Sequence, residues 1–144
     1  MESSPNLILV QSFLDRLKTL DVDRVLELTT PDVEYQNVPL PPDRGQGAVG
    51  RTLRMYNRVL TQFDCRLHNI AESNGVVLTE RTDVLRGPLL DLEFWVAGTF
   101  EVRDGKIAVW RDRFDLATVA LQFLVSPVRK LVQRGLAARP QQQQ

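Results

Sequence analysis

Two aspartates and one arginine are the residues of this chain best placed to do chemistry. Asp83 stands two positions after Arg81, and Asp112 stands in a later segment of similar character. Because side chains alternate across a strand, Arg81 and Asp83 share one face if their segment is a strand. The planar fork of an arginine can serve two carboxylates at once. Carboxylates that lie close together cannot both ionise cheaply, so such a pair supplies one acid and one base.

A tyrosine, an asparagine and two further aromatic residues extend this pattern. Tyr35 and Asn37 share a strand face by the same alternation, and Asp112 shares its face with Trp110 and Phe114. Each pattern is weak when it stands alone, because an Arg-x-Asp pair is more often a solvated face or a structural ion pair. Trp110 and Phe114 are likewise more often core residues than substrate contacts. Spacing alone therefore indicates a pocketed domain with candidate buried charges.

The first half of the chain has mainly the spacing of helices. Ser3 or Ser4 can cap a helix that opens at Pro5, and proline excludes a helix or a central strand from residues 39–42. The helix that opens at Pro5 has an apolar stripe made of Leu7, Val10, Leu14 and Leu17. We expect a second, shorter helix that is capped by Asp21 and broken at Thr29–Asp32. A strand over Val33–Val38 and a helix over about Gln46–Leu60 should follow.

The second half has the pattern of an antiparallel meander followed by a helix. Asn74-Gly75 and Asp104-Gly105 suit tight hairpin turns because these residues tolerate positive φ. Helices first and a meander later predict an α+β domain, and one strongly curved sheet around helices leaves a pocket. The expected strands are Phe63–Ile70, Val76–Leu85, Leu89–Val102 and Lys106–Phe114, and the expected helix is Leu116–Ala138, kinked at Pro127. We expect one domain over residues 1–138 and a disordered tail over residues 139–144.

Composition removes several classes of function. The formal net charge of +0 gives no overall attraction to nucleic acid or to an anionic membrane. One cysteine, Cys65, and one histidine, His68, form neither a zinc cluster nor the usual pairing of a nucleophile with a histidine. The N-terminus lacks the basic start of a secretion signal, and no apolar run is long enough to span a bilayer. We therefore expect a cytoplasmic protein without a metal or organic cofactor.

Three segments taken together resemble the limonene-1,2-epoxide hydrolase family. They are Tyr35–Pro42, Leu78–Leu85 and Gly105–Leu116, and the likeness covers nearly the whole chain in order and with similar gaps. The resemblance implies a curved mixed sheet with helices that enclose a deep, largely apolar pocket, as in nuclear-transport-factor-2-like and ketosteroid-isomerase-like domains. It also implies a homodimer.

The resemblance assigns a role to each of five residues. Asp112 is implied to be the base that takes a proton from water, and Tyr35 and Asn37 are implied to hold that water. Asp83 is implied to protonate the epoxide oxygen, with Arg81 bridging the two carboxylates. The reaction implied is the addition of water to an epoxide, giving a diol without a covalent enzyme intermediate.

An apolar wall would select lipophilic epoxides such as terpene or cyclic alkene oxides. The sequence departs from the family pattern at Arg113, where the family often has tyrosine, and in the Leu89–Leu92 region, so the preferred substrate stays open. The expected wall residues are Leu14, Leu17, Leu85, Phe94, Val96, Trp110 and Phe114.

Two other classes of function stay open at this point. Another enzyme of the same fold, such as a ketosteroid isomerase or a polyketide cyclase, needs a carboxylate base and an oxyanion donor, but not Asn37 and Arg81 together. A non-catalytic binding module is favoured if Asp83 and Asp112 are exposed and far apart. The basic residues near the C-terminus fit a dimer or lid helix with a solvated face better than a membrane-surface element; they are Arg129, Lys130, Arg134 and Arg139.

Overall fold

The computed structural model describes residues 3–138, so the expected tail at residues 139–144 lies outside the described residues. The helices are α1 (Pro5–Leu17), α2 (Val22–Leu26), α3 (Gln46–Asn57) and α4 (Leu116–Ala137). The strands are β1 (Thr29–Asn37), β2 (Asp43–Arg44), β3 (Gln62–Ser73), β4 (Val76–Gly87), β5 (Leu90–Arg103) and β6 (Lys106–Arg113).

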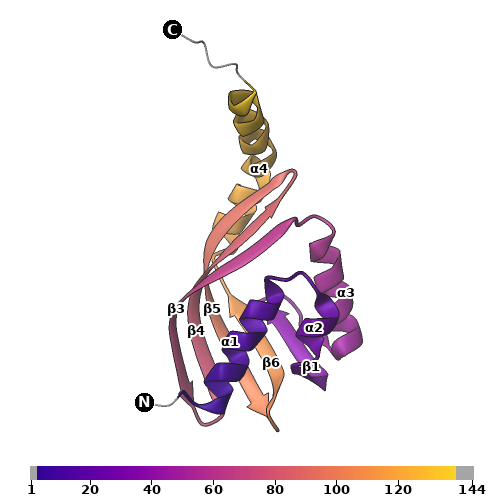
Figure 1. The fold of residues 1–144 in the computed structure, drawn as a ribbon, viewed down its shortest axis with the longest axis vertical. Coiled ribbons are helices and arrows are strands. Elements are labelled where there is room, and N and C mark those ends of the chain that lie inside the picture. The colour runs from indigo at the N-terminus through magenta and orange to yellow at the C-terminus, as the bar shows by residue number, and fades with distance from the viewer. Residues whose placement is uncertain (1–2, 139–144) are drawn as a thin grey trace.

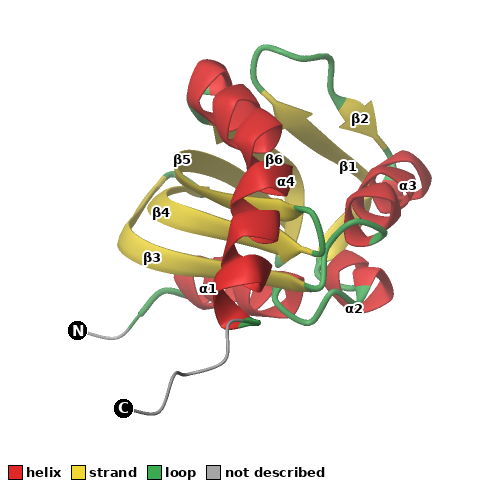
Figure 2. Ribbon diagram, turned by 90° about the horizontal axis from the view of Figure 1, so that it is seen from above, coloured by secondary structure: helices red, strands yellow, loops and turns green. Residues whose placement is uncertain are grey.

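A single mixed sheet organises the domain, as the α+β prediction requires. Its strand order is β2-β1-β6-β5-β4-β3, and β1 runs parallel to β6 while the other neighbours pair antiparallel. The sheet curves strongly, with α1, α2 and α3 on one side, whereas α4 extends beyond the β4–β5 hairpin (Figures 1 and 2). The curvature leaves a hollow between the sheet and the first three helices, where the site lies.

The two hairpin turns predicted from the sequence are confirmed. Asn74 and Gly75 join β3 to β4, and Asp104 and Gly105 join β5 to β6. All four residues have φ between 52° and 77°, the left-handed region that a two-residue turn requires. These turns fix the antiparallel register of the strands that carry the charged residues.

The second helix ends before Thr29 as expected, but the expected start of the next strand at Val33 is wrong, because β1 already begins at Thr29. Thr29 and Thr30 are buried, and Pro31 lies where the pairing of β1 with β6 shifts register, between Thr29 and Glu34. A proline is tolerated at such an irregular stretch because no ladder hydrogen bond needs its missing N–H. The short strand β2 was not predicted, and α3 ends at Asn57 instead of Leu60.

Helix α4 covers part of a strand edge with its side chains. Strand β6 pairs with β5 only from Ala97 onward, so the first half of β5 has no strand neighbour on that side. The Gln122 amide accepts from the Glu93 N–H and donates to the Glu93 carbonyl, both at 2.8 Å. The Ser126 hydroxyl accepts from the Asp91 N–H at 3.0 Å. The helix thus replaces a missing strand.

The other faces of α4 expose apolar side chains. Leu124 is 74% exposed and Val128 is 64% exposed, and Leu121, Phe123, Leu131, Val132 and Leu136 are also exposed. Within residues 3–138, no helix combines the length and the apolar character that crossing a membrane would need.

Candidate active site

Arg81 binds both aspartates inside the protein. Its Nε donates to Asp83 Oδ1 at 2.8 Å and its Nη2 donates to Asp112 Oδ2 at 2.8 Å, with a further Nη2 contact to Asp83 Oδ2 at 3.2 Å. Arg81 is 1% exposed, Asp83 6% and Asp112 4%. A buried charge is costly unless it is paired and hydrogen-bonded, and each of these three charges is. The structure therefore does not place the aspartates exposed and apart, the condition that would favour a non-catalytic module.

A glycine lets the arginine reach across the sheet. Asp83 and Arg81 lie on β4, Asp112 lies on β6, and β5 runs between these two strands. The residue of β5 opposite Asp112 is Gly98, which also pairs with Thr79 of β4. A Cβ at Gly98 would lie 2.5 Å from Arg81 Nη1 and 2.6 Å from Thr79 Oγ1, too close for any side chain. Sequence reasoning did not identify Gly98, although a glycine inside a strand signals close approach.

The surroundings of Asp83 favour its protonated form. Burial raises the pKa of Asp83 to about 6 against the lowering effect of Arg81, and the negative charge of Asp112 raises it further. A carboxyl group with this pKa holds its proton at mildly acidic pH, where an exposed aspartate is ionised. Asp83 is therefore suited to donate a proton.

The surroundings of Asp112 are different, because a second fixed donor reaches it. The Trp110 indole Nε1–H donates to Asp112 Oδ1 at 3.1 Å, while Arg81 occupies Oδ2. Sequence reasoning placed Trp110 on the apolar wall and did not predict this hydrogen bond. Trp110 and Asp112 share a strand face, but whether the indole N–H reaches the carboxylate depends on the rotamer of the indole, which a sequence does not give.

Tyr35 and Asn37 lie beside Asp112 on the neighbouring strand. The parallel pairing of β1 and β6 sets Tyr35 opposite Trp110 and Asn37 opposite Asp112. The Asn37 Nδ2 donates to the Tyr35 hydroxyl at 3.0 Å. Burial, followed by the charge of Asp112, raises the pKa of Tyr35 well above its ordinary value, so the phenol keeps its proton. The two side chains thus present a polar corner next to Asp112 that suits a water molecule.

A pocket opens onto these side chains and is otherwise mainly apolar. Its cavity volume is about 220 Å³, enough space for a small ligand. Asp83, Asp112, Tyr35 and Asn37 line it, together with the predicted wall residues Leu17, Leu85, Phe94, Val96, Trp110 and Phe114. Lining residues that the sequence did not single out are Leu20, Leu53, Tyr56, Asn57, Leu60, Phe63, Leu92 and Val119.

Leu14 does not line the pocket, so its place on the predicted wall is wrong. It is 2% exposed and packs in the hydrophobic core with Val10 and Phe13 of the same helix. Leu17 reaches the pocket because it lies at the C-terminal end of α1. The apolar stripe of a helix does not reveal where the core ends and a pocket begins.

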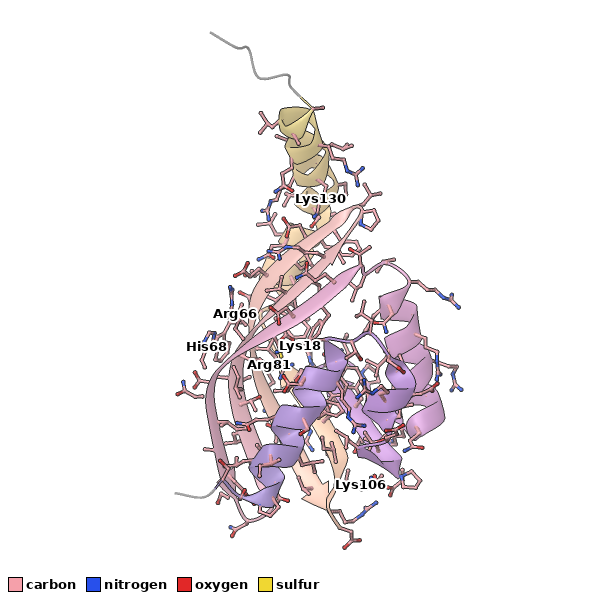
Figure 3. All side chains as sticks on the ribbon, viewed as in Figure 1. Lys18, Arg66, His68, Arg81, Lys106 and Lys130 are labelled. Carbon is pink, nitrogen blue, oxygen red and sulfur yellow. The ribbon has the colours of Figure 1, made fainter. Side chains whose placement is uncertain are left out.

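The single cysteine and histidine are not placed to act as a nucleophile pair. Burial raises the pKa of Cys65 to about 11, so its thiol is protonated at neutral pH. His68 is exposed on β3, where Figure 3 labels it, and it contacts Thr82.

Comparison with known proteins identifies relatives of this chain. The family model for the limonene-1,2-epoxide hydrolase catalytic domain matches residues 4–124. Epoxide hydrolase EphG of Mycobacterium tuberculosis is 42% identical over 108 residues, which are 74% of this chain and 71% of that protein.

Solved structures agree with this result. The structure of an M. tuberculosis LEH-like epoxide hydrolase has a TM-score of 0.76 and 33% identity, covering 96% of this chain and 100% of that chain. A nuclear-transport-factor-2-like protein from Burkholderia pseudomallei has a TM-score of 0.75 at 16% identity, covering 84% of this chain and 98% of that chain. The latter likeness concerns the fold alone, and it agrees with the fold class expected from the sequence.

Proposed function

The chain belongs to the limonene-1,2-epoxide hydrolase family, and from this membership we propose that it adds water to a lipophilic epoxide in one general acid–base step, releasing a vicinal diol. The observation that carries the proposal is Arg81, which holds two buried aspartates at an apolar pocket beside a tyrosine–asparagine pair. A binding pocket for an apolar ligand alone has no need of two buried carboxylates, whose desolvation is costly.

The proposed reaction uses only side chains and water. A water molecule held by Tyr35 and Asn37 loses a proton to Asp112 as its oxygen attacks one epoxide carbon. The bond from that carbon to the epoxide oxygen breaks, and this oxygen takes the proton of Asp83. The proton on Asp112 then returns to Asp83, and Arg81 stabilises the single negative charge wherever it resides.

The pocket supports a lipophilic substrate. Its lining away from the aspartates consists largely of leucine and aromatic side chains, among them Leu53, Phe63 and Phe94. Apolar burial of this kind favours a terpene or cyclic alkene oxide over a charged or sugar-like substrate. We therefore place the natural substrate in that class.

A panel of epoxides incubated with the purified chain tests the function. It should contain limonene oxide, cyclohexene oxide, styrene oxide and a linear alkene oxide, with diols measured by chiral gas chromatography. Each epoxide incubated in the same buffer without protein gives the background of uncatalysed hydrolysis. Diol formation above that background supports the proposal. No diol from any member, combined with turnover of an enone in an isomerase assay, would instead favour the ketosteroid-isomerase class.

The pH dependence of turnover follows from the proposed role of Asp83. Its pKa of about 6 means that the proton needed for the epoxide oxygen is present below that pH and lost above it. We expect kcat/KM to fall as pH rises through about 6. A plot of log(kcat/KM) against pH should reach a limiting slope of about −1. The residual activity of Asp83→Asn should lack this limb. A wild-type kcat/KM that stays constant from pH 5 to 9 would exclude Asp83 as the acid.

We also propose that the chain works as a homodimer, as the family resemblance implies. The exposed apolar side chains of α4, including Leu124 and Val128, support this, because a monomer rarely leaves so many uncovered. Light scattering should give the mass of two chains. Leu124→Glu should lower the measured mass toward that of one chain. Gln133→Glu adds the same charge to the same helix and should leave the mass unchanged. A wild-type mass of one chain at high micromolar concentration would contradict the proposal.

A further inference from the structure

We propose that Trp110 is a positioning residue for the base: its indole N–H aims the carboxylate of Asp112, and its ring fixes the neighbouring Tyr35. This inference rests on the proposed function, because it concerns which of two aspartates acts as the base. It assigns a polar role to a side chain that spacing alone places on the apolar wall.

The first step is that the two aspartates draw their donors from different residues. Arg81 gives Asp83 two contacts, at 2.8 and 3.2 Å, and gives Asp112 one, at 2.8 Å. Trp110 supplies the second donor to Asp112, at 3.1 Å. An indole N–H only donates, so it pairs with a carboxylate oxygen that carries a lone pair and not with a carboxylic O–H. A fixed donor of this kind holds the carboxylate in one orientation.

The second step is the rigidity of the indole. Trp110 is 4% exposed, and its ring packs edge-on against Phe13 at a centroid distance of 5.0 Å. The Trp110 ring also contacts the Tyr35 ring, at a centroid distance of 3.9 Å and an angle of 41°. Two ring contacts in a buried site hold the indole N–H towards Asp112. The same contact fixes the phenol that is proposed to hold the water.

The third step concerns the other groups that face Asp112. Arg81 and Asp83 face it from β4, Tyr35 faces it from β1 and Tyr56 faces it from α3. Of these, Arg81 is a cation shared with Asp83, and both tyrosines are neutral because burial raises the pKa of each. The Trp110 N–H is thus the donor that distinguishes Asp112 from Asp83 in the described structure.

Trp110→Phe tests the proposal because it keeps an aromatic ring and removes the N–H. Without that donor the carboxylate of Asp112 is free to turn away from the water, so kcat should fall about tenfold while KM stays close to the wild-type value. Trp95→Phe is the matched control, since Trp95 is 51% exposed and alternation turns it away from the site. Both kcat and KM of Trp95→Phe should equal the wild-type values.

A KM that rises in step with the fall of kcat, or a kcat that does not fall, would mean that Trp110 only fills space, and would overturn the proposal. A smaller ring in a buried site costs stability in either case, so a lowered melting temperature does not discriminate.

A second measurement uses the protein with an unchanged site, so it tests the proposal even if Trp110→Phe does not fold. In ¹⁵N-labelled wild-type protein the two indole N–H signals can be assigned with Trp95→Phe. We expect the Trp110 indole proton to shift as Asp83 gains its proton near pH 6, because both aspartates share Arg81, while the Trp95 signal stays constant. A Trp110 signal that does not respond between pH 3 and 8 would refute the contact. This readout is independent of turnover, so it stands apart from a failure of the proposed hydrolase function.

Discussion

Asp112→Asn is expected to lower kcat by about 10²- to 10⁴-fold, and Asp83→Asn by a similar factor, because each removes one half of an acid–base pair. The amide that replaces Asp112 cannot take a proton from water, and the amide that replaces Asp83 cannot deliver one to the epoxide oxygen. Both substitutions are nearly isosteric, so each variant should keep the far-ultraviolet circular dichroism of the wild type. Initial rates of diol formation measure the effect.

Asp104→Asn is the matched control for these two variants. Asp104 lies in the exposed turn between β5 and β6, with a φ of 52° that asparagine also adopts readily. Its rate should equal that of the wild type. Either active-site variant turning over epoxide at the wild-type rate, with a normal melting curve, would show that the corresponding role is misassigned.

Arg81→Ala is expected to destabilise the fold by about 3–5 kcal/mol as well as to abolish most turnover, because removing one partner of a buried ion pair leaves the others uncompensated. Here two carboxylates lose their common cation, and both are buried. Urea unfolding monitored by tryptophan fluorescence measures the loss. The loss should shrink as pH falls through about 6, because Asp83 then takes up a proton and one of the two buried negative charges disappears.

Arg66→Ala separates this effect from the loss of an ordinary surface pair. Arg66 lies on β3 and pairs with Glu93 where both side chains are about half exposed, on the outer side of the sheet in Figure 3. An exposed pair contributes only about 0–1 kcal/mol, so this control should remain close to the wild type. Equal losses for Arg81→Ala and Arg66→Ala would mean that the cluster around Arg81 does not behave as a buried ion network.

Much of this architecture could be predicted from local patterns because the patterns and the fold agree. Asn74-Gly75 and Asp104-Gly105 require positive φ, and the structure puts them in tight hairpins. Alternation along β4 correctly puts Arg81 and Asp83 on one buried face. Alternation says nothing about which strands become neighbours, so the meeting of Arg81 with Asp112 across β5 depended on the family resemblance.

Other features could not be read from spacing, for physical reasons. Gly98 is required because a guanidinium lies over its Cα, which is a tertiary contact between β4 and β5. Leu14 and Leu17 share a helix stripe, yet only Leu17 reaches the pocket, because the hollow begins beyond the core. Ser126 is 0% exposed because it pairs with the edge of β5, and nothing in the helix pattern predicts that edge.

The central claim is that Asp112 activates a water molecule that attacks the epoxide directly, with no aspartate bound to carbon. A single turnover in oxygen-18 water, with enzyme in excess over epoxide, tests it most directly. Direct hydration places one heavy oxygen in the diol in that first turnover and leaves Asp83 and Asp112 unlabelled, as mass spectrometry of the peptides would record. Unlabelled diol from the first turnover, followed by heavy oxygen in the carboxyl group of Asp83 or Asp112, would contradict the account. In that outcome an aspartate would be the nucleophile, and Tyr35 and Asn37 would have no water to position in the ring-opening step.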